Sequence, residues 1–163
     1  MDGNSGAQAR ETVVTRKSDR ELVVTRVFDA PARIVFEAWS RAELFQRWWV
    51  PKALGVPLRA CEMDVRTGGG YRLEFGLDAA NAMAFYGKYV EVVPPSKIVW
   101  TNEESGEITV TTVTFEDRGD KTLLTLSELY PSKDACDEAL QGSAAGLPIQ
   151  FEQLDELLVE LAG

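Results

Sequence analysis

The segment from Arg26 to Pro51 constrains the fold of this chain more strongly than any other part of its sequence. A run of β-branched residues, typical of a strand, ends at Asp29-Ala-Pro31, where the proline can begin a helix because the first helical position needs no amide donor. Ser40-Arg-Ala-Glu43 fits a capping box, in which serine and glutamate side chains bond the free amides at a helix start. The segment therefore predicts a strand followed by two short helices, the second ending before Pro51.

A change of period predicts a sheet over residues 58–128. Tyr71, Leu73 and Phe75 alternate with polar residues, and this period of two is typical of a half-buried strand. Similar runs predict further strands, joined as an antiparallel meander, at residues 58–65, 83–93, 97–101, 107–116 and 121–128.

The N-terminal region contains two near copies of one short sequence, Glu11–Arg16 and Glu21–Arg26. Both copies are rich in β-branched residues, which favour strands. Because there is only one such pair, we interpret the first copy as an N-terminal extension of the strand formed by the second, and not as a repeat architecture. Residues 1–10 are small and polar and are expected to form a disordered tail, which leaves a single domain over residues 11–163.

The C-terminal segment has the pattern of a long amphipathic helix. Ser132 can cap a short helix reaching about Gln141, and Gly142, Gly146 and Pro148 then predict a break or kink. The apolar stripe at helical spacing beyond it consists of Leu147, Phe151, Leu154, Leu158 and Leu161. An amphipathic helix that closes an antiparallel sheet predicts a two-layer α+β fold.

The composition excludes several classes of function. The chain has no histidine, which excludes a Ser-His-Asp triad, a Cys-His pair and any zinc site that contains histidine. No group of carboxylates has the spacing of a metal site, so we expect neither a metal nor a cofactor. The formal net charge is −9, and an acidic chain without a basic stripe is a poor partner for nucleic acid or an anionic membrane.

Targeting and redox features are those of a cytoplasmic protein. No apolar run approaches the roughly 18 residues needed to cross a bilayer, and the N-terminus lacks the apolar centre of a signal peptide. We therefore expect a cytoplasmic location without membrane insertion. Cys61 and Cys136 have no partner at the spacing of a redox or metal motif, so we expect two reduced thiols.

Several motifs resemble those of one known family. Its opening is matched by Val24-Thr-Arg-Val-Phe-Asp-Ala-Pro31, Phe36-Glu-Ala-Trp39 and Trp48-Trp49-Val-Pro51. Its first hairpin, central strands and closing helix are matched by Asp64–Gly69 with Tyr71, by Gly87–Thr101 and by Leu154–Leu161. On these residues the chain resembles the START-like, or SRPBCC, superfamily, in the branch named for the activator of the ninety-kilodalton heat-shock protein ATPase. The resemblance covers roughly residues 20–161 and is closest to the single-domain bacterial members.

The resemblance implies a helix-grip fold. In this α+β arrangement, a curved antiparallel sheet of six to seven strands wraps around a long C-terminal helix, with two short helices after the first strand. It also implies a cavity between the concave face of the sheet and the final helix. The chain departs from the family at Gly146-Leu147-Pro148, where an aromatic residue usually follows the glycine, and at Ser127-Glu128, where a histidine is frequent.

The implied cavity is where we place the candidate ligand-binding residues. Alternation along the strands predicts that it is lined by Tyr71, Leu73 and Phe75, with Phe85, Trp100 and Phe151 nearby and Trp39 or Trp49 at its mouth. Tyr86 is a further candidate for ligand binding. Each aromatic residue has the alternative of being part of a solid core. The polar candidates are Arg72, Glu74, Tyr86 and Glu128. Arg72 and Glu74 alternate with the apolar residues of their strand, so we expect their side chains to face solvent. The direction of the Tyr86 side chain stays open.

Three functions are compatible with these observations. The first is the binding of a small hydrophobic or amphipathic molecule without catalysis, since no credible catalytic set is present. The second is a module that regulates a chaperone ATPase by docking on its surface through the acidic C-terminal half. The third is an enzyme of the polyketide-cyclase or hydratase kind, using a tyrosine and a carboxylate such as Tyr86 and Glu74. The protein is expected to be a monomer or a homodimer.

Overall fold

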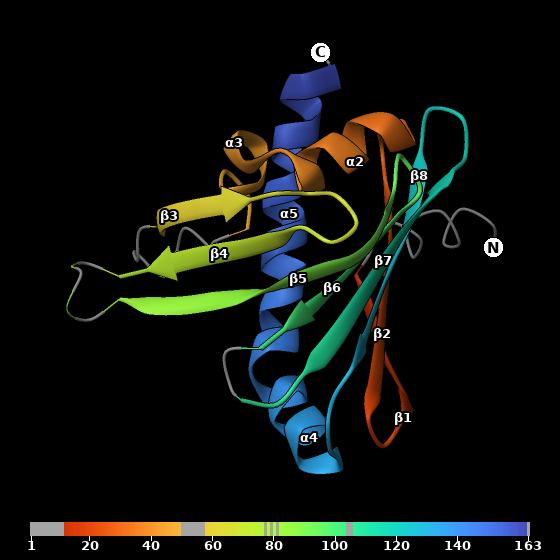
Figure 1. Ribbon diagram of the computed structural model, residues 1–163. Coiled ribbons are helices and arrows are strands. Elements are labelled where there is room, and N and C mark those ends of the chain that lie inside the picture. The colour runs from red at the N-terminus through yellow and green to blue at the C-terminus, as the bar shows by residue number, and fades with distance from the viewer. Residues whose placement is uncertain are drawn as a thin grey trace.

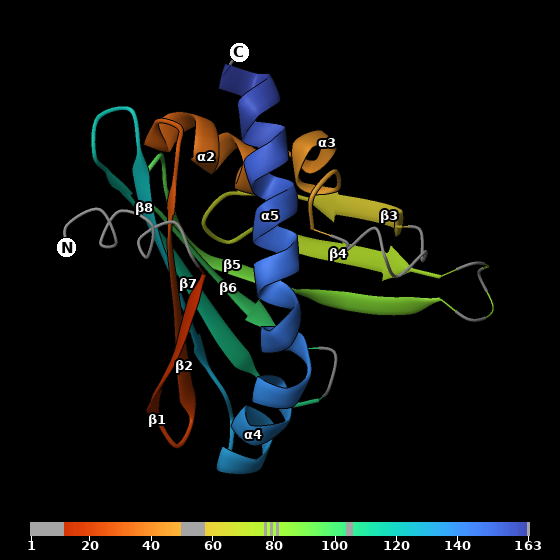
Figure 2. The ribbon, with the colours of Figure 1, turned by 180° about the vertical axis from the view of Figure 1, so that it is seen from behind.

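A computed structural model describes residues 12–49, 58–76, 78, 80, 82–103 and 106–162. Its centre is an antiparallel sheet with strand order β1-β2-β8-β7-β6-β5-β4-β3, crossed on one face by the long helix α5 (Figures 1 and 2). The strands are β1 (Val13–Ser18), β2 (Glu21–Phe28), β3 (Leu58–Met63), β4 (Gly70–Phe75), β5 (Met83–Val93), β6 (Lys97–Asn102), β7 (Thr109–Asp117) and β8 (Thr122–Leu129). The helices are α2 (Ala32–Ser40), α3 (Ala42–Phe45), α4 (Lys133–Gln141) and α5 (Ser143–Ala162). The α+β helix-grip architecture is therefore confirmed.

In the described part of the chain the sheet has eight strands, where the sequence predicted six to seven. The extra strand is the first of the two near copies, because β1 pairs antiparallel with β2 and Val14 lies opposite Val24. Asp19 and Arg20 form the turn between them, and a two-residue turn is the usual connection of a hairpin. The interpretation of the first copy as an extension of the second is therefore wrong.

The strand register defines one face of the sheet, here called the inner face. Leu73 on β4 lies opposite Phe85 on β5, and Tyr89 farther along β5 lies opposite Trp100 on β6. Because side chains alternate between the two faces of a strand, every second residue of β4, of β6 and of β5 as far as Tyr89 lies on this face; a register shift between Tyr89 and Glu91 interrupts the alternation in β5. The helix α5 crosses it, and Phe151 of α5 is fully buried there.

The helices α2 and α3 lie at one end of the inner face (Figure 1). Ser40 is the last residue of α2, and the N-cap of α3 is Arg41, which makes no side-chain capping bond. The predicted capping box is therefore wrong, because the break between the helices falls one residue later than that motif requires. Glu43 instead accepts a hydrogen bond from Nε of Arg41 at 2.8 Å.

The C-terminal helices begin as expected but continue through the proline. The Ser132 hydroxyl accepts a hydrogen bond from the Ala135 amide at 3.1 Å, which confirms the predicted cap of α4. The predicted break occurs at Gly142, between α4 and α5, and α5 runs unbroken from Ser143 with Pro148 inside it. Pro148 lies early in α5, so the proline removes one helical hydrogen bond close to an end where amides already lack partners.

Polar contacts attach α5 to the rest of the fold. Arg26 on the inner face of β2 forms an ion pair with Asp155 of α5, and its guanidinium lies 5.1 Å from the ring centre of Phe28. The amide of Gln153 donates to the carbonyl oxygen of Trp48 at 2.8 Å. These contacts fix α5 on one side to the sheet and on the other to the segment after α3.

Several other sequence expectations concern the cysteines, the membrane and the chain ends. Cys61 and Cys136 are free thiols, as expected. Across the described ranges, no helix combines the length and apolarity needed to cross a membrane. The expected disordered tail over residues 1–10, and the expected helix stop at Pro51, fall outside the described residues.

Candidate ligand-binding site

Four of the predicted ligand-binding residues are buried in the core. Trp39, Leu73, Trp100 and Phe151 are at most 9% exposed. The ring centre of Trp39 lies 5.9 Å from that of Trp100 and 6.2 Å from that of Phe151. These side chains therefore fill the space between α2, α5 and β6. Within the described residues, the indole N–H of Trp39 is buried without a hydrogen-bond partner, which is uncommon.

Another four of these residues are only partly buried and lie beside the core. Tyr71, Phe75 and Phe85 project from the inner face of β4 and β5, and Trp49 follows α3. Phe75 and Phe85 meet edge to face with ring centres 5.3 Å apart. The neighbouring β3 adds two more partly buried apolar side chains to the same face. We call this surface the apolar arm; it consists of Cys61, Met63, Tyr71, Phe75 and Phe85.

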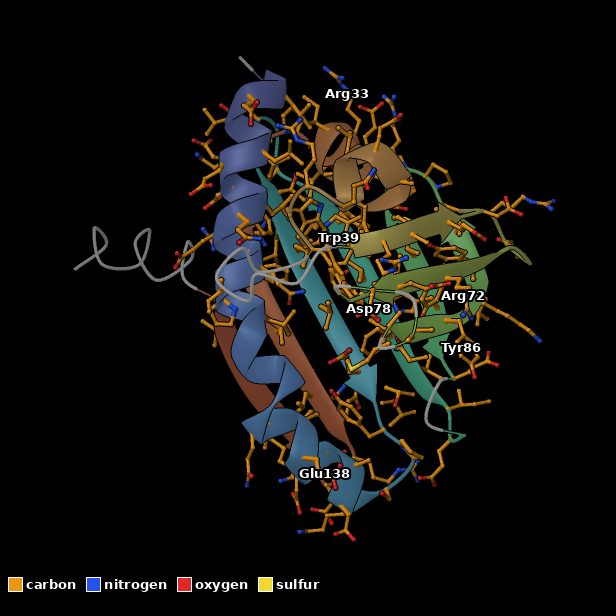
Figure 3. The ribbon with its side chains drawn as sticks, turned by 90° about the vertical axis from the view of Figure 1, so that its left-hand side faces the viewer. Arg33, Trp39, Arg72, Asp78, Tyr86 and Glu138 are labelled. Atoms are coloured by element: carbon orange, nitrogen blue, oxygen red, sulfur yellow. The ribbon has the colours of Figure 1, made fainter. Side chains whose placement is uncertain are left out.

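The ninth predicted residue, Tyr86, lies on the opposite face from the apolar arm. It is 40% exposed, and Figure 3 shows it with Arg72 on the side of β4 and β5 away from α5, whereas Trp39 lies between α5 and the sheet. The Arg72 guanidinium lies 5.9 Å from the Tyr86 ring centre and donates to a Glu74 carboxylate oxygen at 3.0 Å. The structure thus groups Tyr86 with Arg72 and Glu74, and not with the other eight residues.

A chain of polar side chains continues the inner face beyond the apolar arm. The Tyr71 hydroxyl lies 2.7 Å from the Thr101 carbonyl oxygen and 2.8 Å from Oδ1 of Asn102. The Asn102 amide donates to the Thr111 hydroxyl at 3.0 Å, and this hydroxyl lies 3.3 Å from Oε2 of Glu128. The Tyr130 hydroxyl donates to Oε1 of Glu128 at 2.7 Å. We call this set the polar row; it consists of Tyr71, Asn102, Thr111, Glu128 and Tyr130.

Gly87 allows the apolar arm to join the polar row. It lies opposite Tyr71 in the register of β4 and β5. A Cβ atom at this position would lie 1.9 Å from the Thr101 carbonyl oxygen, far inside van der Waals contact. Only glycine therefore lets β5 lie close enough to β6 for the Tyr71 hydroxyl to reach across to Thr101 and Asn102.

Burial shifts the pKa of two groups on the inner face. It raises the pKa of Glu128, against the smaller opposing effects of the Tyr130 and Thr111 hydroxyl bonds. Burial also raises the pKa of Tyr89 far above its ordinary value, so this phenol stays neutral. The titratable group at the polar end of the inner face is therefore a carboxyl group without a cationic partner among the described residues.

A shallow hollow of about 390 Å³ opens beside the arm. It is lined by Glu62, Met63, Asp64, Gly70, Tyr71 and Arg72. Met63 and Tyr71 connect it to the inner face, so it provides an approach to the arm from the edge of the sheet. No group of three potential metal-ligating side chains occurs in the part of the chain that the structure describes.

Sequence reasoning missed Asn102, Thr111 and Tyr130. A signal was present for two of them, because Asn102 has the parity of Trp100 and Thr111 that of Val113. Both are thus polar residues at positions where alternation predicts inward-facing apolar ones. Their mutual contact was not readable, since it depends on the register of β6 against β7.

Comparison with known proteins identifies the relatives of this fold. The family model described as "Activator of Hsp90 ATPase homolog 1-like protein" matches residues 29–159. No curated protein matches the sequence.

Several solved bacterial proteins share the fold. A crystal structure from Rhodobacter sphaeroides has a TM-score of 0.80 at 21% identity, over 93% of this chain and 99% of that one. A solution structure from Staphylococcus epidermidis has a TM-score of 0.78 at 23% identity, over 91% of this chain and 94% of that one. A crystal structure from Chromobacterium violaceum has a TM-score of 0.69 at 27% identity, over 85% of this chain and 96% of that one. The resemblance inferred from the motifs is confirmed.

Proposed function

The chain belongs to the family of activator of Hsp90 ATPase homolog 1-like proteins, and on this premise we propose that it binds a small hydrophobic or amphipathic molecule on the inner face of its sheet. The apolar arm is the observation that carries the proposal. Its aromatic side chains stay partly exposed although they adjoin a tightly packed aromatic core. An apolar ligand that covers them would gain roughly 25 cal/mol for each Å² removed from water.

The surroundings of the arm support an amphipathic ligand over a purely apolar one. Ligand sites in proteins are mostly apolar, with a few polar groups that fix the orientation of the ligand. Here the polar groups begin at Tyr71, which belongs to both the apolar arm and the polar row. The core behind the arm is rigid, because Trp39 packs against aromatic rings on several sides. A preformed surface of this kind loses little entropy on binding.

Titration with Nile red, a neutral apolar dye, tests the proposal. Phe85→Ala removes a ring of the apolar arm and is expected to weaken dye binding by about tenfold. Val90→Ala is the matched control, because Val90 is on the same strand but is 54% exposed and lies outside the arm. Saturable binding that Phe85→Ala weakens and Val90→Ala leaves unchanged supports the proposal. Equal binding by both variants and the original chain, or no binding at all, refutes it.

The enzyme alternative would use Tyr86 and Glu74. Both residues lie on the face away from the apolar arm, and the Glu74 carboxylate is held by Arg72. A reaction at this pair would therefore need a substrate on the exposed face of β4 and β5, separate from the surface that favours ligand binding. A measured turnover that Tyr86→Phe abolishes would establish this alternative, and one that Tyr86→Phe leaves unchanged removes the assignment.

A second candidate function is docking on a chaperone ATPase, favoured by the exposed side of α5. Ile149 and Val159 are 48% and 74% exposed, and Glu152, Glu156 and Glu160 lie on the exposed part of the same helix. A pull-down and an ATPase assay with the cognate chaperone, at low salt, test this function. Loss of binding in Val159→Asp would support it, and no binding by the original chain would remove it. Cytoplasmic residence and a monomeric or homodimeric state stay predictions.

A further inference from the structure

The polar row shows one direction of hydrogen bonding that ends at Glu128. The Asn102 amide donates to the Thr111 hydroxyl, which leaves that hydroxyl's proton for Oε2 of Glu128. The Tyr130 hydroxyl donates to Oε1 from the other side at 2.7 Å. Every donor of the row that reaches Glu128 is therefore neutral, and the carboxylate is the final acceptor.

Within the described part of the chain, Glu128 has acceptor capacity left over and no cation to balance its charge. An ionised carboxylate offers about four lone-pair sites, of which the two hydroxyl groups use two. Among the described residues, no lysine or arginine lies within ion-pair distance of it. Arg26, the buried cation on the inner face, is instead paired with Asp155. As a whole residue Glu128 is partly exposed, whereas Thr111 beside it is fully buried.

The titratable groups around Glu128 leave this balance unchanged. The Tyr130 hydroxyl donates to it, and the buried thiol of Cys136 on α4 packs with Tyr130. Arg20, at the turn between β1 and β2, directs its guanidinium to the Tyr130 carbonyl oxygen at 3.0 Å. On β7 the neighbour of Glu128 is the uncharged Thr111. Residues 143–151 of α5 contain no charged residue.

From this geometry we propose that the ligand is an amphipathic amine, whose protonated nitrogen binds Glu128 while its apolar part lies on the apolar arm. The inference rests on the proposed function and adds the chemical class of the ligand. An ammonium group supplies the missing positive charge and donates to the free lone pairs, and hydrogen bonds between charged partners are about twice as strong as neutral ones. The register aligns Glu128 with Tyr89 of β5 across three strand spacings, about 14 Å. The ring of Tyr71, which belongs to the apolar arm, lies 5.7 Å from that of Tyr89, so an extended alkyl chain from Glu128 can reach this end of the arm.

Binding of an ammonium group at Glu128 depends on pH. Burial raises the pKa of Glu128 in the empty site, and an ammonium partner favours the ionised carboxylate. Binding of the amine therefore releases a proton wherever Glu128 is still protonated. The affinity for an amine rises with pH through this pKa and then levels off, whereas the affinity for a neutral ligand of the same length does not follow that curve.

The test compares decylamine with decanol by isothermal titration calorimetry near neutral pH. The original chain is expected to bind decylamine about tenfold more tightly than decanol, as one charge-assisted hydrogen bond predicts. Glu128→Gln is expected to abolish this preference and to leave decanol binding unchanged. Tyr130→Phe removes a bond that lowers the pKa of Glu128, so it should move the pH midpoint of decylamine binding upward. A purely structural role would not move that midpoint.

The outcomes separate the inference from the proposed function. Equal binding of decylamine and decanol by the original chain overturns the amine inference and leaves ligand binding intact. A preference that survives in Glu128→Gln, or a pH curve that Tyr130→Phe does not move, also overturns it. Binding of neither probe overturns both proposals. If Glu128→Gln fails to fold, the midpoint measured with Tyr130→Phe decides the question alone.

Discussion

The ion pair between Arg26 on β2 and Asp155 on α5 predicts that Asp155→Ala is more destabilising than loss of an ordinary surface pair. The Arg26 side chain is 9% exposed and Asp155 is 39% exposed. Nε of Arg26 is buried without a hydrogen-bond partner among the residues that the structure describes, so this carboxylate is the main compensation for its charge. Removing one partner of a buried pair costs about 3–5 kcal/mol. Because water reaches Asp155, we expect a smaller loss of about 2 kcal/mol.

Thermal unfolding measures this loss and includes a control on the same helix. A loss of about 2 kcal/mol corresponds to a fall in Tm of roughly 4–8 °C for a chain of this length. Glu160→Ala breaks the pair between Glu160 and Arg47, whose side chains are 63% and 46% exposed, and should cost under about 1 kcal/mol.

The double variant separates the cost of an unpaired charge from the value of the pair. Arg26→Met combined with Asp155→Leu removes both charges and is expected to recover most of the stability lost in Asp155→Ala. If Asp155→Ala lowers Tm no more than Glu160→Ala does, or if the double variant is less stable than either single variant, the reasoning about the buried arginine is refuted.

The remaining predictions concern Glu128, Gly87 and the two thiols. Burial raises the pKa of Glu128, so the folded chain binds more protons than the unfolded chain. Its stability therefore falls as pH rises from the unfolded pKa through the folded pKa, and Glu128→Gln should remove this loss. Urea unfolding at several pH values would contradict the prediction if the stability of the original chain and that of Glu128→Gln changed with pH in parallel. Gly87→Ala should destabilise the fold, because its Cβ would meet the Thr101 carbonyl oxygen at 1.9 Å, and an unchanged Tm would contradict the close approach. Cys61 is partly buried and Cys136 is buried, so a thiol reagent should modify Cys61 first in the folded protein, and mass mapping that finds Cys136 first would reject this order.

Local pattern predicted most of the strands and one face of the sheet. The alternation of Tyr71, Leu73 and Phe75 with Arg72 placed these residues on their observed faces, because a strand's period of two is a property of its own sequence. The capping box predicted at Ser40 was wrong, because α2 ends at Ser40 and the N-cap of α3 is Arg41, one residue later than the motif requires. The hairpin of β1 and β2 was missed because two similar segments can form either one long strand or two paired strands. The turn at Asp19 makes them two paired strands.

The candidate site was less predictable, for two physical reasons. Whether Trp39 and Phe151 line a cavity or fill a core depends on how closely α5 packs on the sheet, which no single segment encodes. The polar row depends on the register between strands: Thr111 lies opposite both Trp100 and Glu128, and this alignment brings it between Asn102 and the carboxylate. Their inward parity was readable from the sequence, but their contact was not.

Native mass spectrometry of the protein isolated from its own cells tests ligand binding at the apolar arm most directly. The measurement compares the original chain with Phe85→Ala and Val90→Ala, each in native and denaturing solvent. Binding at the apolar arm should give a reproducible small-molecule adduct on the original chain and on Val90→Ala, released by denaturation and depleted in Phe85→Ala. A bare mass for the original chain, or an adduct that Phe85→Ala retains in full, would contradict it.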